Sequence, residues 1–137
     1  MKGKNVFILR GCPGCGKTTL AEELCNNNRS SVICSADDYF MVDDEYKWDA
    51  EKIHLAHLWC QQLFKENLKD GTEIIVVANT NTTTKDVNTY RDIALEYGYK
   101  VFVTVVENYH NGVNTHNVPK EILEKMENTI KQNIKLT

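Results

Sequence analysis

A short segment near the start of the chain matches the pattern of a loop that binds nucleoside phosphates. It runs from Gly11 to Thr18, reads Gly-Cys-Pro-Gly-Cys-Gly-Lys-Thr, and fits G-x-x-x-x-G-K-[ST] at every fixed position. The glycines let the backbone curl so that its N–H groups converge on phosphate oxygens. Lys17 supplies a cation for the β- and γ-phosphates, and the Thr18 hydroxyl can ligate Mg²⁺. The residues predicted to contact ATP or GTP are Gly11, Cys12, Pro13, Gly14, Cys15, Gly16, Lys17, Thr18 and Thr19.

The same loop contains a second pattern that has to be weighed. Cys12 and Cys15 form a C-x-x-C between an apolar run and a helical pattern, where a thioredoxin-like redox pair lies. Redox catalysis would leave Lys17 and Thr18 without a role, so we interpret the cysteines as small loop residues. Oxidation of the pair, closing the loop to nucleotide, stays open as a hypothesis.

Carboxylates follow the second predicted strand, at the edge of a parallel sheet where ligands bind. A carboxylate there can accept a proton from an attacking hydroxyl or hold Mg²⁺. We expect Asp37 to do so, because the strand before it should lie beside the phosphate-binding loop. Asp38 and the acidic residues after it are explained more simply as a solvated loop.

The third predicted strand lacks a residue that such sites often have. A P-loop enzyme often ends this strand with an Asp that orders Mg²⁺, but here Ala78 stands in that place. Asn79 and Asn81 follow, and their amides can bind a water, a phosphate or an acceptor sugar. Helix capping explains Thr82–Thr84 equally well. His57, on the long helix, is interpreted as a half-buried structural residue.

The elements that must position these residues alternate along the chain. Apolar runs predict strands at 6–9, 31–35, 73–78 and 99–106, and helical periodicity predicts helices at about 17–25, 50–68, 87–97 and after Pro119. The acidic stretch 36–49 is predicted to be a loop. Strands alternating with helices indicate a parallel sheet with helices on both faces. We therefore expect an α/β fold, a P-loop three-layer sandwich with about four strands.

The composition of the chain argues against several classes of protein. The chain has 137 residues, with 16 Lys and Arg against 19 Asp and Glu, so its formal net charge is −3. This balance argues against a protein that coats nucleic acid by charge alone. The longest apolar run, Ile74–Ala78, is too short for a membrane helix. An odd count of five cysteines favours a reducing compartment, so we expect one cytoplasmic domain spanning 1–137.

Several of these segments together resemble the small P-loop kinase domains of the phage polynucleotide 5′-kinase type and their zeta-toxin-like relatives. The resemblance rests on Leu9–Thr19, Ala36–Phe40, Ala56 and His57 with Trp59, Asn79–Asn81, Tyr97–Val101 and Asn114–Met126. It implies transfer of the γ-phosphoryl group of ATP to a hydroxyl, such as a polynucleotide 5′-OH, a nucleoside or another small molecule.

The resemblance also implies roles for single residues. Asp37 would be the general base, Lys17 would stabilise the migrating phosphoryl group, and Thr18 with Asp37 would hold Mg²⁺. The residues placed around the acceptor would be Asp38, Tyr39, Asn79 and Asn81. Arginines expected between the last strand and the last helix are missing, because residues 107–118 contain no Arg or Lys. A nucleotide-binding regulatory module without transfer activity is therefore the alternative.

Overall fold

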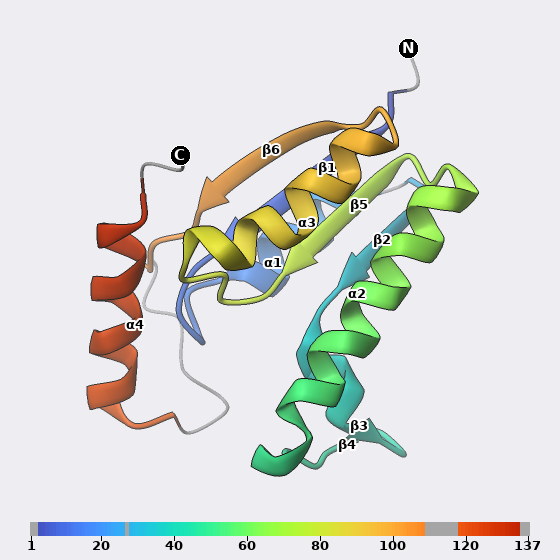
Figure 1. Ribbon diagram of the computed structural model, residues 1–137. Helices are drawn as coiled ribbons and strands as arrows, with labels where there is room; N and C mark the ends of the chain where they lie inside the picture. Colours follow the sequence, from blue (N-terminus) through green and yellow to red (C-terminus); the bar gives the residue numbers. More distant parts are fainter. Residues whose placement is uncertain (1–2, 27, 109–117, 135–137) are drawn as a thin grey trace.

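The fold is built on one four-stranded parallel sheet, as a computed structural model shows for residues 3–26, 28–108 and 118–134. Its strands, in spatial order, are β2 (Ser31–Cys34), β5 (Ile74–Ala78), β1 (Asn5–Arg10) and β6 (Lys100–Val105). All three neighbouring pairs run parallel, as Figure 1 illustrates. The predicted P-loop NTPase fold with a parallel sheet is confirmed.

Helices cover both faces of this sheet. The helices α2 (Ile53–Asp70) and α3 (Thr84–Glu96) lie on one face, and α1 (Lys17–Cys25) lies on the other (Figure 1). Alternation along β1 explains the two cores, because Val6 and Ile8 pack with α2 and α3, whereas Leu9 packs with α1. The last helix, α4 (Lys120–Gln132), stands beside the end of β6.

The helix ends have clear local causes. Helix α3 begins with a capping box, in which Thr83 Oγ1 accepts from the Asp86 N–H and the Asp86 carboxylate accepts from the Thr83 N–H. The capping explanation for this threonine-rich stretch is therefore confirmed. Helix α2 ends at Asp70, and Gly71, which follows it, adopts the left-handed conformation with φ 75°.

The stretch predicted to be a loop at 36–49 is instead structured. It contains a 3-10 helix, η1 (Ala36–Phe40), and a short hairpin of β3 (Met41–Val42) and β4 (Glu45–Tyr46). Asp43 and Asp44 form the turn with φ of 52° and 62°, which Asp tolerates better than most residues. A further 3-10 turn, η2 (Ala50–Lys52), precedes α2, so that helix starts later than predicted.

Candidate active site

The phosphate-binding loop joins the carboxyl end of β1 to the start of α1. Gly16 caps α1 with φ 104°, a conformation that L side chains adopt only with strain. Gly11 is needed for close approach, because a Cβ there would lie 2.5 Å from Cys15 Sγ and 2.7 Å from the carbonyl oxygen of Val106. The backbone path that lets N–H groups converge thus depends on both glycines.

The lysine of the loop is held against its backbone. Lys17 Nζ donates to the carbonyl oxygens of Gly11, at 2.7 Å, and Cys12, at 3.0 Å. The positive charge of the Lys17 side chain therefore lies at the loop itself, next to the N-terminus of α1. A bound phosphate would replace these two neutral carbonyl acceptors with anionic oxygens, which form stronger hydrogen bonds with the ammonium group.

A pocket of about 610 Å³ lies beside this loop. It is bounded by the loop, by η1 and the start of α2, and by the carboxyl end of β5. The polar residues lining it include Lys17, Thr18, Ser35, Asp37, His57, Asn79 and Thr80. The structure thus brings Lys17 and Thr18, at the start of α1, and Asp37, on η1, to one pocket. His57 is exposed here, so its interpretation as a half-buried structural residue is wrong.

The predicted base, Asp37, has a partner that the sequence did not reveal. The hydroxyl of Tyr46, on β4, donates to Asp37 Oδ1 at 3.3 Å. Burial and, to a smaller extent, the neighbouring Asp37 carboxylate together raise the pKa of Tyr46 to about 12, so the hydroxyl stays a donor at neutral pH. No local pattern marks Tyr46, because the contact depends on the β3–β4 hairpin folding back over η1.

Asn79 links the sheet to the segment that carries Asp37. Its Oδ1 accepts from the Ala36 N–H at 2.8 Å, and its Nδ2 lies 3.4 Å from the Tyr90 hydroxyl and 3.6 Å from Cys60 Sγ. The side chain lines the pocket but the residue is only 8% exposed. Both ends of the amide are thus engaged within the protein, and they hold η1 in place.

Asn81 is not among the residues that line the pocket. It is 3% exposed, and its Nδ2 donates to the Leu9 carbonyl oxygen at 2.7 Å. Its own carbonyl oxygen accepts from Arg10 Nε at 2.8 Å. Arg10 is fully buried. It was not among the residues predicted for the site, and its one signal in the sequence was a charged residue at the end of an apolar strand. The contacts of Asn81 thus hold the end of β1, from which the phosphate-binding loop begins.

The remaining predicted acceptor residues lie on η1, next to Asp37 but outside the lining of the pocket. Tyr39 is half-buried, with its ring 5.6 Å from that of Phe40 and 6.0 Å from that of Trp59. Burial raises the pKa of Asp38, and the neighbouring Asp37 carboxylate adds to this. Their proposed contact with an acceptor stays a prediction.

The environment of the two loop cysteines does not favour redox catalysis. Both are buried and neither is in a disulfide. Cys12 Sγ contacts the Leu123 carbonyl oxygen of α4 at 3.6 Å. Burial raises the pKa of Cys12, with smaller contributions from Glu127 and Cys15. Redox-active thiols are instead marked by a lowered pKa.

A second pocket, of about 430 Å³, lies on the other side of the loop. The loop, the end of β6 and α4 enclose it, and Pro13 lines both pockets. Its apolar lining includes Val105, Val106, Leu123, Ile130 and Ile134, and Glu127 and Lys131 add charge. An apolar slot with a few polar groups is typical of sites for flat organic rings.

The oxygen atoms at the first pocket suit a magnesium ion. Thr18 and Asp37 offer a hydroxyl and a carboxylate there, and Mg²⁺ is commonly bound through one or two such side chains with phosphate oxygens and water. Within the described residues, no group of three or more His, Cys, Asp or Glu side chains gathers to hold a metal. The donors present therefore fit an ion that arrives with its nucleotide.

Most of the arginine-free segment, residues 109–117, lies outside the described residues. In the part of the chain that the structure describes, no helix is long and apolar enough to cross a membrane.

Comparison with known proteins agrees with this geometry. The profile of a family described as AAA domain matches residues 6–131. NEDD4-binding protein 2 of Homo sapiens is 32% identical over 131 residues, which is 90% of this chain but only 7% of that protein. The chain thus spans a small part of this curated relative.

Solved structures share the fold at low identity. A chain of the Pnkp1/Rnl/Hen1 RNA repair complex superposes with a TM-score of 0.72 at 19% identity, covering 98% of this chain and 46% of that one. The crystal structure of APE1195 gives a TM-score of 0.59 at 19% identity, covering 97% and 77%. The resemblance to P-loop kinase domains of the polynucleotide kinase type is confirmed at the level of the fold.

Proposed function

We propose that this chain, which belongs to the AAA domain family, transfers the γ-phosphoryl group of ATP to a hydroxyl. The acceptor would be a polynucleotide 5′ end or a related nucleoside or small molecule. The observation that carries the proposal is that Lys17, Thr18 and Asp37 line the same pocket. A phosphate-binding lysine and a carboxylate facing one cavity are the parts that phosphoryl transfer needs.

In the proposed reaction, the acceptor oxygen forms a bond with the γ-phosphorus while the bond from that phosphorus to the β–γ bridging oxygen breaks. The bridging oxygen keeps the electron pair and leaves as part of ADP. The hydroxyl proton passes to the carboxylate of Asp37, and Tyr46 orients that carboxylate from 3.3 Å. Lys17 and the loop N–H groups balance the charge on the phosphates.

Magnesium would add a positive charge that neutralises the phosphate oxygens, held by the Thr18 hydroxyl and Asp37. The pocket on the other side of the loop would take the nucleotide base. Its apolar lining from β6 and α4 suits a flat ring, and Pro13 joins it to the phosphate site. The loop would thus bind the phosphates between a base pocket and an acceptor pocket.

A nucleotide-binding module without transfer activity is the second candidate. The observation that favours it is the lack of Lys and Arg in residues 107–118, where the resemblance to polynucleotide 5′-kinase domains implies arginines. Loss of an arginine that stabilises the transition state costs about 10³–10⁵ in rate. A module of this kind would bind ATP through the loop and transfer no phosphate.

The test is transfer from γ-labelled ATP to 5′-OH DNA, 5′-OH RNA, nucleosides and small metabolites. Asp37→Asn should keep ATP affinity and lose transfer by about 10²–10⁴-fold, the usual contribution of a general base. Lys17→Ala should lose both. Asp92→Asn, an exposed carboxylate on α3, is the matched control and should behave like the wild type.

Label transferred equally well by Lys17→Ala would contradict the kinase assignment. Tight ATP binding with no transfer to any acceptor would favour the binding module. In that case Asp37→Asn should change nothing that can be measured.

A further inference from the structure

The acceptor side of the first pocket has a lining suited to a flat, uncharged ring. Past Asp37, its walls come from η1, the segment after β4 and the start of α2. The apolar and ring-bearing residues there are Phe40, Trp48, Ile53, Ala56 and His57. The Trp48 side chain is 55% exposed, so its indole can stack on an entering ring.

Positive charge is scarce on this side. Of the described residues that line the pocket, Lys17 is the only lysine or arginine, and it belongs to the phosphate loop. A polynucleotide acceptor would bring a phosphate within one nucleotide of the reacting hydroxyl, and sites that accept such phosphates normally pair them with lysine or arginine.

The segment that supplies Asp37, Phe40 and Trp48 to the pocket is instead rich in negative charge. Residues 36–52 carry Asp37, Asp38, Asp43, Asp44, Glu45, Asp49 and Glu51 against Lys47 and Lys52. One of the two lysines is already paired, because Lys47 Nζ lies 3.6 Å from Glu45 Oε2. A second anion entering here meets net repulsion.

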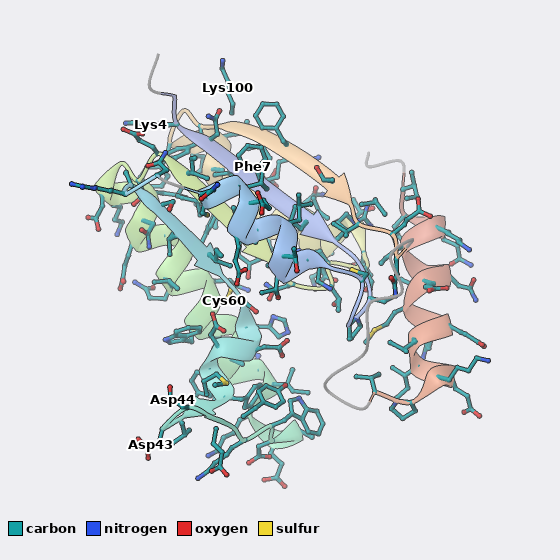
Figure 2. The ribbon with its side chains drawn as sticks, turned by 180° about the vertical axis from the view of Figure 1, so that it is seen from behind. Lys4, Phe7, Asp43, Asp44, Cys60 and Lys100 are labelled. Carbon is teal, nitrogen blue, oxygen red and sulfur yellow. The ribbon has the colours of Figure 1, made fainter. Side chains whose placement is uncertain are left out.

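This acidic hairpin is fixed in place. The Lys47 N–H donates to the Phe40 carbonyl oxygen at 2.8 Å, and Tyr46 reaches Asp37. Figure 2 shows Asp43 and Asp44 at the tip of the hairpin, on the side of the molecule below Cys60. The hairpin is thereby held against η1, the segment that supplies Asp37 and Phe40 to the pocket.

We infer that the acceptor is a small neutral molecule with a flat ring and a primary hydroxyl, of the nucleoside class, and not a polynucleotide. This inference rests on the proposed function, since it names the acceptor of that same pocket. Ring stacking and the Asp37 carboxylate select the neutral molecule, and the acidic hairpin rejects its phosphorylated counterpart.

The first experiment measures binding by calorimetry, with the nucleotide site filled by a non-hydrolysable ATP analogue and Mg²⁺. Thymidine and thymidine 3′-monophosphate differ only in the phosphate group. Thymidine should bind about tenfold more tightly, the factor that two surface-strength charge repulsions would produce. The difference should shrink as NaCl rises from about 50 to 500 mM, because salt screens repulsion.

Variants separate the two sources of selectivity. Asp43→Asn with Asp44→Asn removes two charges and keeps residues that tolerate the positive φ of the turn. It should tighten binding of thymidine 3′-monophosphate about threefold or more and leave thymidine unchanged. Trp48→Leu should weaken thymidine about fivefold or more, the effect of one lost stacking contact. Asp70→Asn, at the far end of α2, is the control for both.

The second experiment measures phosphate transfer from γ-labelled ATP to the same two compounds and to a 5′-OH oligonucleotide. If the phosphorylated compounds bind as tightly as thymidine or more tightly, or if thymidine does not bind, the inference is overturned. If thymidine binds with the expected preference but receives no label, the inference on ligand class stands and the proposed kinase activity fails.

Discussion

Arg10 offers the strongest test of how the fold supports the site. Its guanidinium is fully buried and donates to three carbonyl oxygens, those of Asn81 at 2.8 Å, Asn133 at 2.9 Å and Thr82 at 3.1 Å. These bonds join the end of β1 to the segment after β5 and to the end of α4. The substitution Arg10→Met keeps a long unbranched side chain and removes all three.

The expected loss can be worked out from these contacts. Each carbonyl oxygen left without its donor costs about 1 kcal/mol, the lower end of the range for a buried unsatisfied group. The free energy of unfolding should therefore fall by about 3 kcal/mol in Arg10→Met. The free energy of unfolding of Arg10→Lys should lie between those of the wild type and of Arg10→Met, because an ammonium cannot reproduce the planar guanidinium that reaches three acceptors.

The assay is urea unfolding followed by circular dichroism, with Arg91→Met as the matched control. Arg91 lies on α3 and pairs with the exposed Asp92 at 3.4 Å, so its loss should cost less than about 0.5 kcal/mol. Hydrogen exchange should also speed up more in α4 than in α2, since Arg10 holds the carbonyl oxygen of Asn133. If Arg10→Met and Arg91→Met lose equal stability, the reasoning is refuted.

Three further substitutions test the site. Gly16→Ala should weaken ATP binding about tenfold by calorimetry, because its φ of 104° strains an L residue by about 1–2 kcal/mol; unchanged affinity would mean that the loop does not need this conformation. Tyr46→Phe should lower kcat up to about tenfold, the worth of one hydrogen bond, and leave the KM for ATP unchanged; a raised KM alone would argue against its role in orienting Asp37. Asp38→Asn should raise Tm at pH 7 and not at pH 3, because a raised folded-state pKa means that ionisation of Asp38 costs stability as pH rises; an equal gain at both values would point to another cause.

Local patterns were enough to predict the fold and the phosphate loop. The runs at 6–9 and 74–78 are short and continuous, as in strands buried on both faces, and helical patterns alternate with the predicted strands along the chain. The loop at Gly11–Thr18 needs only neighbouring residues, a strand before it and a helix after it. Both patterns are contained within short stretches of chain, so they can be recognised without knowledge of the tertiary structure.

Short-range patterns could also mislead. The acidic stretch at 36–49 resembles a solvated loop in composition, yet it folds into η1 and the β3–β4 hairpin. Phe40 and the half-buried Tyr46 pack together there, with ring centroids 6.2 Å apart. This segment adopts regular structure because it packs against α2. The stretch is too short for a hydrophobic periodicity that would predict this structure.

The sequence by itself determined that this chain has a P-loop fold, and it predicted a lysine and a carboxylate at the same edge of a parallel sheet. Only the tertiary structure decided which polar residues face the pocket and which lie beneath it. Arg10 and Asn81 are far apart in the chain but bond to one another, and Tyr46 reaches Asp37 only through the hairpin. Such contacts depend on how distant segments pack, because a buried polar group must find a partner wherever the fold supplies one.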